Sequence, residues 1–172
     1  KGELEPYRLK QLAQLLFQAG EFKESEAIID QLIRVGDISL FKLKFQLLVQ
    51  EGKKPEAEAL LKDLVLTDRA QPAERLWLAQ AQRQLGQFEK SEQLVRELVE
   101  KDDNLELPDA WLLLASLLRE EKKSFEAHEL LNRVRRLPAS ENQKLTTARI
   151  AETIGELELA NPGVSRNLVG SS

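Results

Sequence analysis

The sequence contains no cysteine and no methionine, and only 5% of its 172 residues are aromatic. The absence of cysteine excludes disulfides, thiolate metal sites and cysteine nucleophiles. Aromatic and β-branched residues are scarce beside Leu, Ala, Glu, Gln, Lys and Arg, which argues against a sheet protein and for helices. No apolar run approaches the roughly 20 residues of a membrane-spanning helix. The compartment stays open, because a cysteine-free domain suits cytoplasm and periplasm alike.

The net charge of the chain argues against one class of partner, nucleic acids. Acidic residues outnumber basic ones by 29 to 25, which gives a net charge of −4. Because phosphate binding needs a basic face, we expect no nucleic-acid partner. A chain of this length with 42% hydrophobic residues is expected to bury a substantial core. It starts at Lys1 and has no methionine, so we expect an excerpt of a longer chain.

Two stretches of the sequence repeat each other 66 residues apart: LAQLLFQAGEFKESEAI begins at Leu12, and LAQAQRQLGQFEKSEQL begins at Leu78. A weaker form recurs elsewhere, as a glycine, an aromatic or apolar residue two places on, and Ala or Ser three places further. Five copies are centred, in order, on Gly20, Gly52, Gly86, Lys122 and Gly155. Successive centres lie 32, 34, 36 and 33 residues apart. This near-fixed period indicates stacked repeats.

Each period is predicted to form two helices. Apolar residues recur at helical spacing before and after the glycine, as in the series Leu9, Leu12, Ala13, Leu16 and the series Ile28, Ile29, Leu32, Ile33. The glycine falls where the first helix must end with a left-handed residue. The Ala or Ser that follows lets the two helices approach closely. The fourth copy, at Lys122, lacks the turn glycine.

The fifth copy is incomplete. Ser140 to Gln143 matches a capping box, which predicts the start of its first helix. Gly155 would end that helix, and a second helix would begin near Glu156. We therefore expect one continuous array over residues 1–161, followed by a flexible, vector-derived tail over 162–172. The expected repeats cover residues 6–37, 38–70, 71–105, 108–139 and, in part, 140–161.

The pattern resembles the tetratricopeptide repeat (TPR) family over nearly the whole chain. The third copy carries most of the signature, with Leu78, Ala79, Gly86, Phe88, Ser91, Val95 and Leu98. Departures are Phe45 where a small residue is usual, Lys54 where an aromatic is usual, and an extra segment at 102–107 that lengthens one link. The resemblance implies an all-α fold, a right-handed α-solenoid of antiparallel helix pairs.

In this family the first helices line a concave groove that holds a peptide or helix of a partner protein. Transferring the groove-facing places, together with one tryptophan beside them, gives the candidate partner-binding residues. They are Lys10, Gln14, Phe17, Gln18, Lys42, Gln46, Gln50, Leu76, Trp77, Gln80, Arg83, Gln84, Arg119 and Arg149.

Two features of this set suggest how a partner is held. Gln recurs at positions i and i+4 in three successive repeats, so stacked repeats would form a ladder of amides able to hydrogen-bond a peptide backbone. Five of the residues are basic, which favours a partner segment with Asp or Glu. Both features also fit an ordinary solvated helix surface, and that alternative stays open.

The remaining chemistry-bearing residues predict no catalysis and no cofactor. Trp111 falls at a core place of the repeat, whereas Trp77 fits either a partner contact or packing against the next repeat. His128 is the only histidine, and no nucleophile or metal-binding constellation accompanies it. We expect it to be a solvated helix residue.

These observations predict a non-catalytic, protein-binding module of a larger, bacterial protein, with oligomerisation as an open possibility. One alternative is a structural scaffold that uses its ends or convex face. Similar TPR regions occur in bacterial response regulators and in secretion or exopolysaccharide export assemblies. A less favoured alternative is an RNA-binding helical repeat, which the acidic balance opposes.

Overall fold

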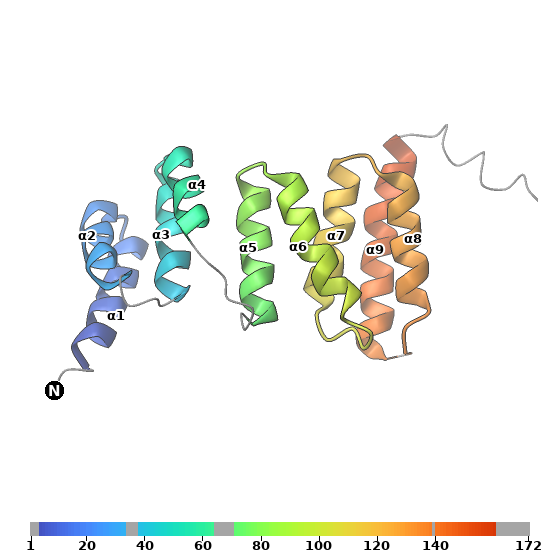
Figure 1. Ribbon diagram of the computed structural model, residues 1–172, viewed down its shortest axis with the longest axis horizontal. Coiled ribbons are helices and arrows are strands. Elements are labelled where there is room, and N and C mark those ends of the chain that lie inside the picture. The colour runs from blue at the N-terminus through green and yellow to red at the C-terminus, as the bar shows by residue number, and fades with distance from the viewer. Residues whose placement is uncertain (1–3, 34–37, 64–70, 139, 161–172) are drawn as a thin grey trace, which may run out of the picture. The chain divides into compact units, whose positions relative to one another are not determined.

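The computed structural model describes residues 4–33, 38–63, 71–138 and 140–160, and within these ranges all regular secondary structure is helical (Figure 1). The predicted tail at 162–172 lies outside the described residues. The helices are α1 (Leu4–Gln18), α2 (Phe22–Leu32), α3 (Ile38–Gln50), α4 (Lys54–Asp63), α5 (Pro72–Gln84), α6 (Phe88–Glu100), α7 (Pro108–Glu120), α8 (Ser124–Arg135) and α9 (Glu141–Ala160). The all-α helical-repeat prediction is confirmed.

The helices belong to two compact units. Unit 1 spans Lys1–Ala70 and holds α1 to α4, and unit 2 spans Gln71–Ser172 and holds α5 to α9. Within each unit, consecutive helices pack against each other, both inside a repeat and from one repeat to the next. A single continuous array and its right-handed sense concern both units together and stay predictions.

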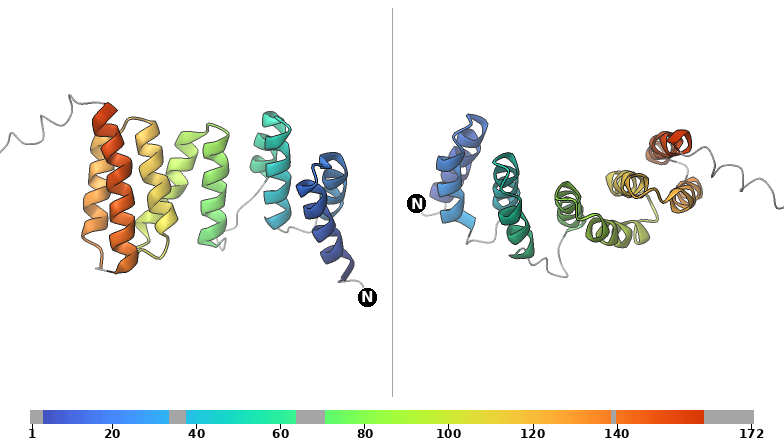
Figure 2. Two further views of the ribbon diagram at one scale, coloured as in Figure 1. Left: turned by 180° about the vertical axis from the view of Figure 1, so that it is seen from behind. Right: turned by 90° about the horizontal axis from the view of Figure 1, so that it is seen from above.

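Unit 2 has two layers of helices. Figure 2 shows α5, α7 and α9 in one layer and α6 and α8 in the other. We call the outer side of α5, α7 and α9 the first-helix face, and the outer side of α6 and α8 the second-helix face. The predicted partner-binding residues of this unit all belong to the first layer.

Glycine ends the first helix in three repeats, as predicted. Gly20, Gly52 and Gly86 have φ angles of +83°, +73° and +82°, in the left-handed region. At the third turn the N–H of Gly86 donates to Arg83 O at 2.9 Å, and the next N–H donates to Gln82 O at 2.9 Å. These bonds satisfy carbonyls that the end of a helix leaves without partners.

The fourth repeat makes the same turn without a glycine. Lys122 occupies the turn position with φ of +58°. Its N–H donates to Arg119 O at 3.0 Å, and the N–H of Lys123 donates to Leu118 O at 2.8 Å. The turn is therefore set by the repeat packing, and the lysine bears a cost of about 1 kcal/mol in this conformation.

The small residue after each turn allows close helix packing, as predicted, and two serines add a hydrogen bond. Ser91 is fully buried, and its Oγ donates to Ala79 O at 2.7 Å. Ser25 makes the same bond in the first pair at 2.8 Å. Ala57 and Ala127 occupy this place in other pairs and are fully buried. The duplicated stretch thus encodes a repeated contact between paired helices.

The lengthened link of unit 2 is ordered by a buried carboxylate. Asp102, which the sequence places in a simple connection, is only 6% exposed. Its carboxylate accepts hydrogen bonds from the N–H groups of Glu106 at 2.7 Å and Leu107 at 2.9 Å. It also accepts the indole N–H of Trp111 at 3.0 Å. Trp111 is fully buried within the core of unit 2, as predicted.

The predicted end of the fifth first helix at Gly155 is wrong. Helix α9 continues through this residue to Ala160. The following residues, 156–160, are Glu, Leu, Glu, Leu and Ala, which are good helix formers. A glycine inside a helix costs only about 1 kcal/mol, too little to stop it there.

The predicted capping box at the start of α9 is half formed. The N–H of Gln143 donates to Ser140 Oγ at 3.1 Å, which is one of its two bonds. The side chain of Gln143 donates instead to Val134 O of α8 at 3.3 Å. The side-chain amide of Gln143 thus connects α9 to α8, and this contact could not be predicted from the local sequence pattern.

Candidate functional site

Three predicted partner-binding residues converge in unit 2. Gln80, Arg83 and Gln84 of α5 line a shallow pocket of about 460 Å³ together with Phe88 and Glu120. Both glutamines are exposed, so their amides are open to a ligand. The pocket therefore combines hydrogen-bonding groups, a charged pair and an aromatic ring on the first-helix face.

The two residues that complete the pocket are absent from the predicted set. Phe88 is the first residue of α6, and the turn at Gly86 brings its ring beside the end of α5. It remains 37% exposed. The position of Phe88 directly after the turn could have identified it from the sequence. An aromatic ring at this position can lie beside the last turn of α5, next to Gln84. Glu120 comes from α7, at a place that the family pattern also turns toward the groove, and the fold brings it beside Arg83.

An ion pair crosses this site between neighbouring repeats. Arg83 Nε donates to Glu120 Oε2 at 3.1 Å, and Arg83 Nη2 contacts the other carboxylate oxygen. The hydrogen bond to Glu120 raises the pKa of Arg83 above its ordinary value, with a smaller opposing effect of burial. The positive charge predicted for this part of the face is thus offset by a carboxylate of the chain itself.

A row of leucines lies beside the polar site. Leu76 of α5, Leu112 of α7 and Leu145 of α9 occupy equivalent places in three successive repeats. The first two are half-buried against the core of unit 2, whereas Leu145 is 58% exposed. The next equivalent row contains Gln80 on α5 and the exposed Arg149 on α9. The first-helix face therefore offers apolar and polar rows side by side.

Two other predicted residues of unit 2 are half-buried. Trp77 and Arg119 each interact with other groups of the protein. Their roles as partner contacts stay predictions.

In unit 1 the predicted glutamines are exposed, and the other candidates are partly engaged. The exposed side chains are those of Gln14, Gln18, Gln46 and Gln50. Phe17 is half-buried and its ring lies 5.6 Å from that of Phe22, so it packs against α2. Lys10 and Lys42 are half-buried and interact with other groups. A glutamine ladder through three repeats would span both units and stays a prediction.

His128 has a local role in α8. It is half-buried, and its Nδ1 lies 2.7 Å from Ser124 O, one helical turn earlier. Across the described ranges, no group of three or more His, Cys, Asp or Glu residues is arranged to hold a metal ion. None of the described helices is long and apolar enough to cross a membrane.

Comparison with known proteins identifies the repeat. Residues 48–117 match a family model described as tetratricopeptide repeat, a span that includes all of α5 and α6. The structure is similar to the crystal structure of YrrB, described as a TPR protein with an unusual peptide-binding site. The TM-score is 0.54 and the identity 14%, over 91% of this chain and 87% of that chain. No curated protein sequence gives a significant match. The likeness to YrrB shows a shared helical-repeat fold.

Proposed function

We propose that this chain, whose residues 48–117 match the tetratricopeptide repeat, binds an extended segment of a partner protein on the first-helix face of unit 2. The observation that carries this proposal is the convergence of Gln80, Arg83 and Gln84 on one pocket with Phe88 and Glu120. In this role the chain is a non-catalytic module of a larger assembly.

The glutamine pair supplies the contacts to the partner backbone. Gln80 and Gln84 are one helical turn apart and exposed, and each amide can donate and accept hydrogen bonds. An extended peptide presents N–H and C=O groups that match them without regard to its sequence. These contacts fix the path of the peptide across α5.

Side-chain selection comes from the surroundings of this pair. The exposed ring of Phe88 and the leucine row that ends at Leu145 offer contacts to apolar side chains. Arg83 offers a charge to an acidic side chain that replaces Glu120. This exchange is feasible because a partly exposed ion pair contributes only about 0–1 kcal/mol. The favoured ligand thus combines apolar residues with an Asp or Glu.

Peptide selection by display tests this proposal. A library of random peptides is selected on the wild-type chain alone, and the enriched peptides are then tested for binding to a face variant carrying Gln80→Ala, Arg83→Ala and Gln84→Ala. A matched control carries Gln93→Ala, Asn132→Ala and Arg135→Ala, two amides and one arginine that are exposed on α6 and α8. We expect enriched peptides with acidic and apolar residues that bind the control and not the face variant. Peptides that bind all three proteins equally would contradict the site.

A further inference from the structure

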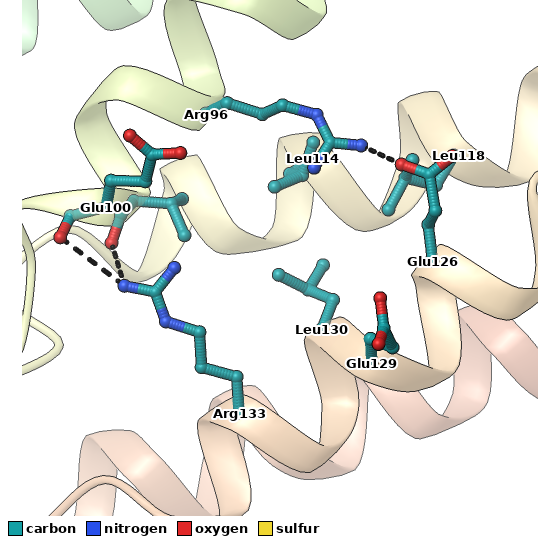
Figure 3. A pocket seen from close by; sticks show the side chains of 9 residues that line it. Arg96, Glu100, Leu114, Leu118, Glu126, Glu129, Leu130 and Arg133 are labelled. Carbon is teal, nitrogen blue, oxygen red and sulfur yellow. Dashed lines mark hydrogen bonds and ion pairs between the residues drawn. The ribbon is translucent and has the colours of Figure 1, made fainter.

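The second-helix face of unit 2 contains a separate pocket, with a volume of about 190 Å³ (Figure 3). Leu114 and Leu118 of α7 line it from within the unit, Val99 lines it from α6, and Leu130 lines it from α8. All four side chains are buried. None of the predicted partner-binding residues belongs to this pocket, which lies in the other helix layer from the first-helix face.

Two arginine bridges join α6 and α8 across the pocket. Arg96 of α6 pairs with Glu126 of α8. In the opposite direction, Arg133 of α8 donates to the carbonyl oxygens of Val99 at 3.0 Å and Glu100 at 3.4 Å, both on α6. Figure 3 shows the two bridges on opposite sides of the space above the leucines. They connect the two helices at the edges of the pocket.

Both guanidinium groups are already committed to the protein. Arg96 Nε donates to Glu92 Oε1 at 2.7 Å, in addition to its pair with Glu126. The guanidinium of Arg133 lies over the ring of Trp111, 5.1 Å from its centroid, while it donates to the two carbonyls. A ligand carboxylate would have to displace at least two partners from either arginine, whereas the only described partner of Arg83 is Glu120, so this pocket is poorly suited to an anion.

The pocket rim carries carboxylates without partners of their own. Glu100 and Glu129 line the pocket from opposite helices and are exposed. Neither side chain forms an ion pair with any described residue, since the two arginines bind elsewhere. The rim therefore favours a cation close to the entrance.

The size of the pocket limits what can enter it. Pockets that hold drug-sized ligands have roughly 300–1,000 Å³, so this one admits a single side chain and not a metabolite or a helix. We propose that it is a second peptide site, which takes one aliphatic side chain of a partner while an adjacent Lys or Arg of that partner pairs with Glu129 and Glu100. The partner backbone then crosses the groove between α6 and α8.

Minimal peptide probes test this site. Acetyl-Leu-Lys-amide, acetyl-Leu-Glu-amide and acetyl-Ser-Lys-amide are titrated into the whole chain, and the methyl resonances of Val99, Leu114 and Leu130 are followed by NMR. We expect acetyl-Leu-Lys-amide to shift these methyls with millimolar affinity and each of the others to bind about fivefold more weakly. Absence of any shift, or equal shifts from the Lys and Glu peptides, would overturn the proposal.

Two variants locate the probe and separate this site from the first-helix face. Leu130→Phe should fill the pocket and abolish the shifts at the other methyls. Glu129→Lys should reverse the preference in favour of acetyl-Leu-Glu-amide. Because Glu129 is exposed, this substitution should leave the stability of the fold nearly unchanged. The variant with Gln80, Arg83 and Gln84 changed to Ala should bind the probe unchanged. An unaltered preference in Glu129→Lys would contradict the assigned rim.

Discussion

Lys123 Nζ donates a hydrogen bond of 2.7 Å to Glu92 Oε2, which connects the turn before α8 to the second helix of the preceding repeat. Unit 1 has the equivalent contact, with Lys53 Nζ donating to Glu26 Oε2 at 3.4 Å. Each lysine also pairs with the carboxylate two residues before it, at 2.8 Å in unit 2 and 2.9 Å in unit 1. The same charged bridge thus links consecutive repeats in both units.

This bridge predicts acid sensitivity of unit 2. Burial alone would raise the pKa of Glu92, but the hydrogen bonds and positive charges of Lys123 and Arg96 lower it to about 2. Because the pKa of Glu92 is lowered in the folded state, its ionised carboxylate stabilises the fold at pH values above the ordinary pKa of 4.5. This contribution is lost as the pH falls towards 2 and the carboxylate takes up a proton. We expect the free energy of unfolding to fall by on the order of 2 kcal/mol over this range.

Denaturant titrations of the whole chain between pH 5 and about pH 2.5 measure this loss. Glu92→Gln should remove most of the slope, because the amide does not titrate. Glu129→Gln, which removes an exposed carboxylate without an ion pair, should keep it. Parallel pH profiles for wild type and Glu92→Gln would show that the bridge is not the cause.

The non-glycine turn at Lys122 predicts a stabilising substitution. With φ of +58°, Lys122→Gly should raise the free energy of unfolding by about 1 kcal/mol. Gly86→Val, at φ of +82°, should lower it by about 1 kcal/mol or more. Thermal and denaturant unfolding of the two variants measure both changes. A loss of stability in Lys122→Gly would mean that the lysine side chain supports the turn by another contact.

The continuous helix α9 predicts that Gly155→Ala stabilises the protein. No heavy atom of its surroundings lies within 4 Å of a Cβ added there, so the methyl group meets no obstacle. The expected gain is about 0.5–1 kcal/mol from helix propensity. A helix end at this residue would instead make the substitution destabilising, and unfolding measurements distinguish the two signs.

The buried carboxylate in the lengthened link predicts a large loss on its removal. Asp102→Ala leaves two backbone N–H groups and the Trp111 indole without their acceptor, which should cost on the order of 3 kcal/mol. Its exposed neighbour provides the control, since Asp103→Ala should change stability by less than about 0.5 kcal/mol. Equal effects in denaturant unfolding would contradict the capping role.

The features that the sequence predicts well depend on residues near one another in the chain. The period of the repeat, the glycine turns and the small residue after each turn are local patterns, and all follow from helix geometry. Trp111 was predictable as core because it occupies an apolar place of the helix pattern. The place of the turn at Lys122 follows from the period, but its left-handed conformation was not predicted, because it is imposed by packing of the two helices that it joins.

The candidate sites depend on groups brought together from different helices. Gln80, Arg83 and Gln84 share one helical face and could be grouped from their spacing. Glu120 lies 37 residues from Arg83 in the sequence, so its offset of the arginine charge appears only in the fold. Likewise, the sequence does not distinguish Asp102 from other acidic loop residues. Its burial and its three hydrogen-bond donors are visible only in the folded structure.

The most direct test of partner binding on the first-helix face is a calorimetric titration with the peptide obtained by display. It compares the wild type, the face variant with Gln80, Arg83 and Gln84 changed to Ala, and the control variant with Gln93, Asn132 and Arg135 changed to Ala. We predict micromolar affinity, a binding free energy of about −8 kcal/mol, for the wild type and the control variant. The face variant should bind the peptide at least about tenfold more weakly. Equal affinity for all three proteins would contradict the site.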